Sequence, residues 1–218
     1  MELKIVYDNS AIFNFIPSHG FACILTLLGD YLLFDTGWSG PILLKNLKLH
    51  KINPAKIKYV FLSHFHWDHI GGLPDLLLYV KPLVFMPKSF SINFKTEVKK
   101  QAEIIEISQK TEILPGVFTT GELSNKNIVE QSLIIKSKDN VIAVSGCAHP
   151  GVDKILSKAA EIGKVNYLVG GFHDFSKLEL LKGIGNIMPC HCTKNREEIL
   201  RRYPKNSSRI AAGTSITI

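Results

Sequence analysis

The segment Ser63–His69, which reads SHFHWDH, constrains this chain more than any other feature of its sequence. It gathers three imidazoles and one carboxylate within six residues, namely His64, His66, Asp68 and His69. Residues two apart in an extended segment point to the same side, so His64 and His66 can bind one ion together. As the chain turns, Asp68 and His69 face a second ion. Without a cation these groups would repel or desolvate one another, so the motif predicts a metal centre.

Another carboxylate follows an earlier strand-like run. Asp35 comes directly after Tyr31–Phe34 and is followed by Thr36 and Gly37, which predict a turn. An Asp in this place can accept hydrogen bonds from the metal-binding loop and so orient it. The alternative is an ordinary Asx turn that only closes the strand.

Composition narrows the class of protein. The chain has 218 residues, of which 45% are hydrophobic, which excludes a disordered chain and suits one compact domain over residues 1–218. The formal net charge of +7 favours anionic partners, but the lysines are scattered. We therefore expect a phosphorylated small-molecule substrate rather than nucleic acid. No apolar run is long enough to span a membrane and no signal peptide is visible, so we expect a cytoplasmic protein without a membrane partner. The chain could also form a homo-oligomer, a question that its composition leaves open.

The four cysteines are too few and too irregularly spaced for a disulfide framework. We expect reduced thiols, mostly buried, at Cys23, Cys147, Cys190 and Cys192.

Hydrophobic patterning predicts many short strands with a few intervening helices, which indicates a layered α/β or α+β domain. The expected strands are 4–7, 22–28, 31–34, 58–62, 83–86, 104–107, 117–120, 132–136, 141–144, 167–170, 186–188 and 215–218, and the expected helices are 41–50, 152–162 and 194–203. Gly29-Asp30 is typical of a two-residue hairpin. His50 has no supporting pattern and is expected to be exposed.

These motifs resemble the metallo-β-lactamase-fold superfamily, through HFHWDH and the preceding FDTG. The resemblance implies a four-layer αββα sandwich with a dinuclear metal site, usually zinc. Further segments narrow the resemblance to one subgroup, and they occur in order along nearly the whole chain: LSHFHWDHIGGL, TEILPGVFTTGEL, EQSLII, VSGCAHPGV, VGGFH, MPCHCT and AGTSITI. Together these segments look like the subgroup that contains 7,8-dihydropterin-6-yl-methyl-4-(β-D-ribofuranosyl)aminobenzene-5′-phosphate synthase, an enzyme of methanopterin biosynthesis.

The resemblance assigns metal ligands residue by residue. His64 and His66 match the ligands of the first metal, and Asp68 and His69 match those of the second. His191 matches the last histidine of the superfamily, a ligand of the second metal. The cysteines on either side of His191, Cys190 and Cys192, alternate with it and should point away from the metals.

One stretch departs from the family pattern. Where other members carry a third histidine for the first metal, this chain has Glu130-Gln131-Ser132-Leu133, and Cys147 stands at the position of the usual bridging Asp. His149 is the best candidate for the missing ligand, with a surface loop histidine as the alternative. Cys147 either binds metal as a thiolate or only packs.

Several further residues are expected at the site. His173 is expected to be a catalytic group, which either holds the substrate phosphate or transfers a proton. The alternative is a purely structural capping role. His19 either faces the site and binds substrate or lies outside it. Trp67, Phe172 and Phe175 are the expected stacking surfaces for a pterin ring.

The resemblance implies Lewis-acid catalysis by two divalent ions, with zinc favoured by imidazole ligands and iron or manganese as alternatives. In a hydrolase, the resemblance implies that Asp68 binds metal and orients the attacking water, which makes it catalytic. In a synthase, an arylamine displaces pyrophosphate from a pterin methyl carbon. The motif serves both reactions, and it also serves a phosphodiesterase or nuclease, or a metal-binding protein without turnover.

Overall fold

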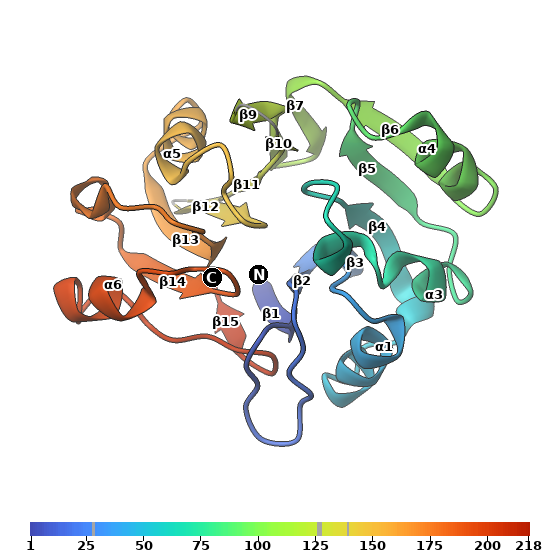
Figure 1. Cartoon of the computed structure of the whole chain (residues 1–218), viewed down its shortest axis with the longest axis horizontal. Coiled ribbons are helices and arrows are strands. Elements are labelled where there is room, and N and C mark those ends of the chain that lie inside the picture. Colours follow the sequence, from blue (N-terminus) through green and yellow to red (C-terminus); the bar gives the residue numbers. More distant parts are fainter. Residues whose placement is uncertain (28, 126–127, 139) are drawn as a thin grey trace. The chain divides into compact units, whose positions relative to one another are not determined.

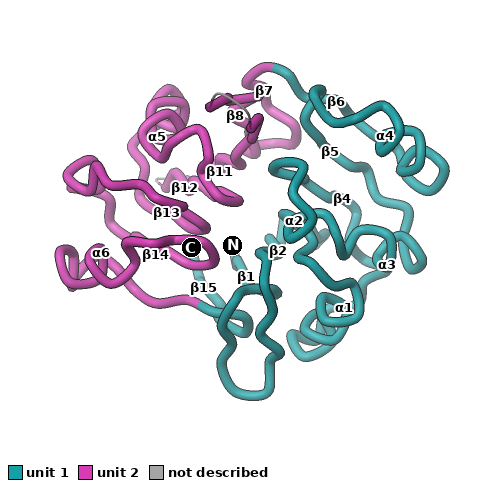
Figure 2. The backbone as a smooth tube through the Cα atoms, viewed as in Figure 1, with its two compact units in different colours: residues 1–108, 211–218 teal, residues 109–210 magenta. Residues whose placement is uncertain are grey.

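The computed structural model describes residues 1–27, 29–125, 128–138 and 140–218. Within these residues the chain divides into two units, coloured separately in Figure 2: Met1–Ser108 with Ala211–Ile218 (unit 1), and Gln109–Ile210 (unit 2). Unit 1 is therefore built from the first and last parts of the sequence, and unit 2 from the continuous segment between them.

Unit 1 contains a mixed sheet with the strand order β15-β1-β2-β3-β4-β5-β6 (Figure 1). Its strands are β1 (Glu2–Tyr7), β2 (Ala22–Leu27), β3 (Asp30–Phe34), β4 (Ile57–Phe61), β5 (Leu83–Pro87), β6 (Glu103–Ile107) and β15 (Ser215–Thr217). Pairing is antiparallel from β15 to β3 and parallel from β3 to β6. The parallel half matters for function, because parallel neighbours end at the same edge of a sheet.

Helices connect the parallel strands of unit 1. They are α1 (Gly40–Leu49), α2 (Trp67–Ile70), α3 (Leu73–Leu77) and α4 (Ile92–Lys99), with the 3₁₀ turn η1 (Pro54–Lys56). The helix α1 has a proline in its first turn, where the missing N–H costs nothing. Its Leu43 and Leu47 are fully buried in one cluster with Leu33 and Val60 of the sheet. This apolar face fixes α1 on the sheet.

Unit 2 contains a sheet with the strand order β14-β13-β12-β11-β8-β7 and a separate hairpin of β9 and β10. The strands are β7 (Gln109–Leu114), β8 (Val117–Gly121), β9 (Leu123–Asn125), β10 (Ile128–Glu130), β11 (Leu133–Ser137), β12 (Asn140–Ser145), β13 (Val165–Gly171) and β14 (Asn186–Cys190). The strands β12, β13 and β14 are parallel, whereas the other neighbours are antiparallel.

The helices of unit 2 are α5 (Val152–Ala160) and α6 (Arg196–Arg202), with the 3₁₀ turn η2 (Leu178–Leu181). On α5 the buried residues are Val152, Ile155 and Ala159, spaced three and four apart, as expected for a helix with one apolar face. They lie in one core cluster with Leu168 of β13. No helix among the described residues is long and apolar enough to cross a membrane.

The strands and helices predicted from the sequence are confirmed, with ends that differ by at most two residues. The predicted hairpin is confirmed, since β2 and β3 are antiparallel, but the predicted loop Gly29-Asp30 is wrong by one residue, because Asp30 belongs to β3 and pairs with Leu27. Leu28, the predicted end of β2, lies outside the described residues. The sequence analysis missed α4, whose segment INFKTEVK carries few apolar residues and buries only Lys95 and Val98.

Candidate metal centre

The parallel pair β3 and β4 brings Asp35 to the start of the metal-binding loop. Phe34 pairs with Phe61, so the residues after these two strands leave the same edge of the sheet. The carboxylate of Asp35 is fully buried and accepts hydrogen bonds from the Ser63 amide (2.7 Å, to Oδ1) and the Ser63 hydroxyl (2.6 Å, to Oδ2). Asp35 thus forms hydrogen bonds with the segment that begins at Ser63. An Asx turn that only closes its own strand would not need these bonds.

These hydrogen bonds also orient two histidine rings. Nδ1 of His69 lies 2.7 Å from Asp35 Oδ2, and Nδ1 of His64 lies 2.9 Å from the Ser63 hydroxyl. Because the carboxylate accepts the Ser63 proton, His64 donates Nδ1–H to Ser63, and His69 donates Nδ1–H to Asp35. In both rings Nδ1 is held by this network, so Nε2 is the nitrogen that points away from it, as in metal-binding histidines.

The first two histidines of the motif face one another. Nε2 of buried His64 lies 3.0 Å from Nδ1 of half-buried His66, and the ring planes are 73° apart. Two nitrogens bound to one tetrahedral zinc at 2.0–2.1 Å would be about 3.3 Å apart. The spacing of this pair therefore fits a shared ion with little rearrangement.

Asp68 and His69 form a second group in unit 1 together with His19. Oδ2 of Asp68 lies 3.6 Å from His69 Nε2 and 3.2 Å from His19 Nε2. Gly20 allows this approach, since a Cβ there would lie 2.4 Å from the Asp68 carbonyl oxygen, and its φ is +128°. The structure thus places His19 beside Asp68, with the His19 side chain 62% exposed.

Exposed aromatic side chains surround the motif in unit 1. Trp67 is 53% exposed and Phe65 is 47% exposed. Trp38, which the sequence analysis did not single out, is 49% exposed, and its ring lies 6.1 Å from that of His19. The expectation for Phe172 and Phe175 is wrong, because both are buried in the core of unit 2 and offer no stacking surface.

In unit 2, the parallel strands β12, β13 and β14 bring further candidate residues to one edge. Cys147 and His149 follow β12, His173 follows β13, and His191 follows β14. His173 and His191 have left-handed backbones, with φ of 45° and 48°. Such strained non-glycine residues concentrate at functional sites, and here they mark two of the three strand ends that carry a candidate histidine.

The carboxylate of Glu130 holds the segment Cys147–His149. Its Oε1 accepts from the Cys147 amide (3.0 Å) and the Ala148 amide (2.9 Å), and its Oε2 accepts from the His149 amide (2.9 Å). Glu130 is 1% exposed, so these bonds are shielded from water. Glu130 therefore fixes the backbone that carries both candidate ligands.

Beside this segment lies a group of possible metal ligands from β12 and β14. The sulfur atoms of Cys147 and Cys192 and a ring nitrogen of His191 all lie within 4.8 Å of one another. The expectation that Cys192 points away from the ligand side of His191 is therefore wrong. Cys190 is fully buried in unit 2. The expectation of thiols that are mostly buried is confirmed, since only Cys192 is half-buried.

His149 and His173 are neighbours, with ring centroids 4.8 Å apart. The side chain of His173 is 34% exposed, and its Nδ1 lies 3.2 Å from Asp174 Oδ1. The hydrogen bond from His173 lowers the pKa of the Asp174 carboxyl, which therefore stays ionised. His173 thus has a carboxylate on one ring nitrogen and an open face beside it, which suits a proton carrier or a phosphate-binding group.

His50 differs from its expected exposure. It is half-buried, with Nε2 3.0 Å from the Ile5 carbonyl oxygen and its ring against Phe15. It takes no part in the groups described above.

The donors in each unit fit divalent transition metals. Unit 1 offers imidazole nitrogens and a carboxylate, and unit 2 offers imidazole and thiol groups, which are the ligand types that zinc prefers. The rings of His64 and His69 support this conclusion most directly, since the Asp35 network holds both through Nδ1 and orients Nε2 toward the neighbouring candidate ligands His66 and Asp68.

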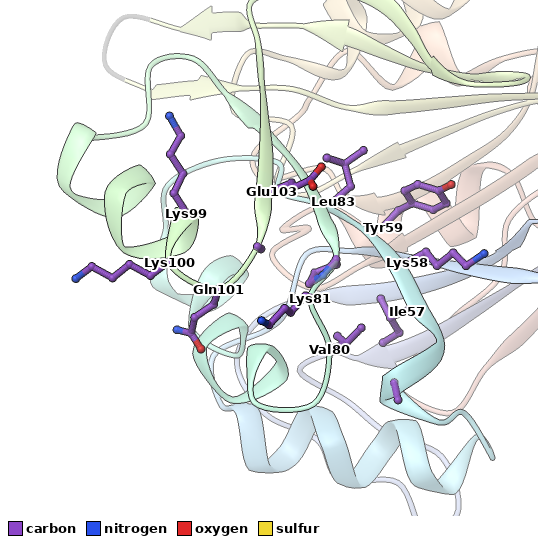
Figure 3. Close-up of a pocket in the computed structure, with 13 residues that line it drawn as sticks. Ile57, Lys58, Tyr59, Val80, Lys81, Leu83, Lys99, Lys100, Gln101 and Glu103 are labelled. Atoms are coloured by element: carbon purple, nitrogen blue, oxygen red, sulfur yellow. The ribbon is translucent and has the colours of Figure 1, made fainter.

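A cavity in unit 1 lies at the other end of the parallel strands (Figure 3). It has a volume of about 680 Å³ and is lined by Ile57–Tyr59, Leu83 and Glu103 at the amino ends of β4, β5 and β6. Lys81 and Lys99–Lys100 also line it, so part of the basic charge of unit 1 lies away from the motif, which follows the carboxyl end of β4.

Comparison with known proteins agrees with this chemistry. Residues 24–175 match the family model of the metallo-β-lactamase superfamily. The chain is 28% identical to the 7,8-dihydropterin-6-methyl-4-(β-D-ribofuranosyl)-aminobenzene-5′-phosphate synthase of Methanocaldococcus jannaschii, over 93% of this chain and 90% of that protein.

Solved structures match over the whole chain. A metal-dependent hydrolase of the β-lactamase superfamily aligns with a TM-score of 0.84 at 27% identity, covering 100% of this chain and 99% of that one. Zn²⁺-bound PqqB from Methylobacterium extorquens aligns with a TM-score of 0.70 at 14% identity, covering 100% of both chains, and so shares the fold alone.

The chain therefore belongs to the metallo-β-lactamase superfamily. The fold class predicted from the sequence, α/β (α+β) with the αββα sandwich of this superfamily, is confirmed by the family match and by the hydrolase structure.

Proposed function

We propose that this member of the metallo-β-lactamase superfamily is a dinuclear metal enzyme that acts on a phosphorylated, pterin-like small molecule. The most direct support is its likeness to the Methanocaldococcus jannaschii synthase, which extends over 93% of this chain and 90% of that protein. A likeness of this extent includes the segments around His173 and His191, beyond the motif that every superfamily member shares. We therefore propose the same reaction type, coupling of a dihydropterin to a ribofuranosylaminobenzene phosphate.

The proposed ligands follow the family pattern except at His149 and Cys147. His64, His66 and His149 hold the first ion, and Asp68, His69 and His191 hold the second. Cys147 is proposed as an additional ligand. Zinc is the favoured metal for this set, with iron or manganese as alternatives.

Bound divalent ions supply Lewis-acid chemistry, which neutralises phosphoryl oxygens or lowers the pKa of a bound water. The residues of the chain supply orientation. Asp35 and Ser63 hold the rings of His64 and His69 at Nδ1 by the hydrogen bonds described above, and so orient Nε2 of each. Asp68 lies within 3.2 Å of His19 Nε2, so a substrate group bound by His19 is held next to a proposed ligand.

In the proposed coupling, a C–N bond forms between the arylamine nitrogen and the pterin methylene carbon. The C–O bond to pyrophosphate breaks, and the amine loses a proton. We propose His173 as the group that accepts this proton or holds the substrate phosphate, since its ring is partly exposed and Asp174 can stabilise the imidazolium form. Trp67 and His19, both exposed, are proposed to contact the substrate.

A general metallohydrolase is the second candidate. It is supported by the hydrolase structure, which matches at 27% identity and a TM-score of 0.84. The two candidates differ in the nucleophile, because water replaces the arylamine in hydrolysis. Since one set of ligands serves both, the substrate assay has to separate them.

The test incubates zinc-loaded protein with dihydropterin-methyl pyrophosphate, with and without ribofuranosylaminobenzene phosphate. Coupled product with release of pyrophosphate supports the synthase. Hydrolysis of simple phosphodiesters or thioesters without coupling supports the hydrolase, and metal binding without either reaction contradicts the enzyme proposal. His66→Ala should abolish turnover, whereas the matched control His50→Gln, at a histidine outside the proposed site, should retain it.

A further inference from the structure

The thiol of Cys192 lies on the same side as the ring of His191, although neighbouring side chains of a strand normally point to opposite sides. Alternation holds only while the backbone is extended. His191 has a φ of 48°, so the chain turns at this residue instead of continuing the strand β14. As a result, the Cys192 sulfur lies within 4.8 Å of both the Cys147 sulfur and a ring nitrogen of His191.

Gly171, at the end of β13, makes room for this thiol. A Cβ on Gly171 would lie 2.7 Å from Cys192 Sγ and 2.4 Å from the Gly146 carbonyl oxygen. Real Cβ atoms do not approach other atoms so closely, so any larger residue would displace the thiol or the β12 loop. The thiol also donates a long hydrogen bond to the Cys147 carbonyl oxygen (3.9 Å).

The other two members of the group are held firmly. Cys147 is fixed through its amide by Glu130, and the carbonyl of His191 accepts a hydrogen bond from Arg196 (3.2 Å). Both residues are 4% exposed, whereas Cys192 is half-buried. The group thus combines two fixed members with one half-buried cysteine.

We propose that Cys192 is a metal ligand and that it forms, with Cys147 and His191, a sulfur-rich ligand set for one ion. This inference rests on the proposed function, since it adds a ligand to the proposed second metal site. On a tetrahedral zinc, two sulfurs at about 2.3 Å are about 3.8 Å apart and a sulfur and an imidazole nitrogen about 3.6 Å, so shifts of about an ångström close the group around an ion.

The donor chemistry determines which metal this set accepts. Thiolate ligands select zinc, cadmium and similar soft or borderline ions, and they disfavour magnesium, calcium and manganese. A site built only from His64, His66, Asp68 and His69 would not discriminate in this way. Under this proposal, the two cysteines of unit 2 determine that the site prefers zinc to magnesium, calcium and manganese.

The first experiment titrates the purified full chain with Cd²⁺ while ultraviolet absorption records the thiolate-to-metal charge-transfer band. Elemental analysis gives the ions bound per chain. Wild type should show the band, and Cys192→Ser and Cys147→Ser should each lose about half of it, because each removes one of two sulfur ligands. The matched control Cys190→Ala removes a neighbouring thiol outside the group and should keep the full band.

The second experiment avoids substitutions altogether. Alkylation of Cys192 by iodoacetamide, followed by mass spectrometry, should be at least about tenfold slower with Zn²⁺ than without metal and unchanged by Mg²⁺. A full band in Cys192→Ser, or alkylation of Cys192 at the same rate with bound zinc, would overturn the thiolate site while leaving the proposed metal enzyme intact. Absence of any bound metal in wild type would overturn both.

Discussion

The buried carboxylate of Glu130 gives the most quantitative prediction for this chain. It accepts three backbone N–H groups, from Cys147, Ala148 and His149, at 2.9–3.0 Å. Hydrogen bonds to a charged group contribute about 1.5–3 kcal/mol each, and unsatisfied buried donors cost about 1–3 kcal/mol each. Because such terms are not additive, Glu130→Ala should lower the free energy of unfolding by about 3–5 kcal/mol.

Glu130→Gln is the more conservative variant, because it keeps the shape of the side chain and removes only part of its hydrogen bonding. Its amide oxygen can accept from one or two of the amides, but its NH₂ group then faces a donor, so we expect about half the loss of the alanine variant. Urea denaturation followed by circular dichroism measures both. Glu179→Gln, at an exposed glutamate of unit 2, is the matched control and should change stability by less than about 0.5 kcal/mol. A loss below about 1 kcal/mol for Glu130→Ala would refute the argument.

Three further predictions concern other parts of the chain. Asp35→Asn should weaken metal retention by about 10–100-fold, since the amide no longer fixes the His69 tautomer; competition with a chromophoric chelator measures this, and wild-type affinity would contradict it. Burial lowers the pKa of His50 below its ordinary value, so the folded state resists protonation. Stability should be complete above about pH 6.5 and fall as the pH drops through the folded pKa, and His50→Gln should flatten this part of the urea-midpoint profile. We also predict one cooperative thermal transition for the chain, as for a single domain, since both terminal segments build one sheet; two resolved calorimetric peaks would contradict this.

The sequence predicted the part of the site that depends on local geometry. Alternation in an extended segment brings His64 and His66 together, and the parallel strand ends explain why Asp35 contacts Ser63. Cys192 was predicted wrongly because the left-handed backbone at His191 breaks the alternation, and nothing in the residue types announces that turn.

Burial of aromatic residues was harder to predict, because it depends on packing between distant segments. Phe172 and Phe175 flank a candidate histidine, yet both lie in the core of unit 2 with the buried face of α5. Trp38 follows the Asp35 turn and is exposed, although a tryptophan at a strand end is equally compatible with burial. The helix α4 was missed because its segment has too few apolar residues to show a helical period.

The pairing of β1 with β15 has a consequence for synthesis on the ribosome. β1 forms hydrogen bonds with β2 on one side and β15 on the other. During translation that second side has no partner until residues 211–218 emerge, after the whole of unit 2. Unit 2 is continuous and can complete its own hydrogen bonding earlier. Until residues 211–218 emerge, β1 is an edge strand, the kind of surface that pairs with other chains, and β15 then covers Glu2–Lys4 of that edge.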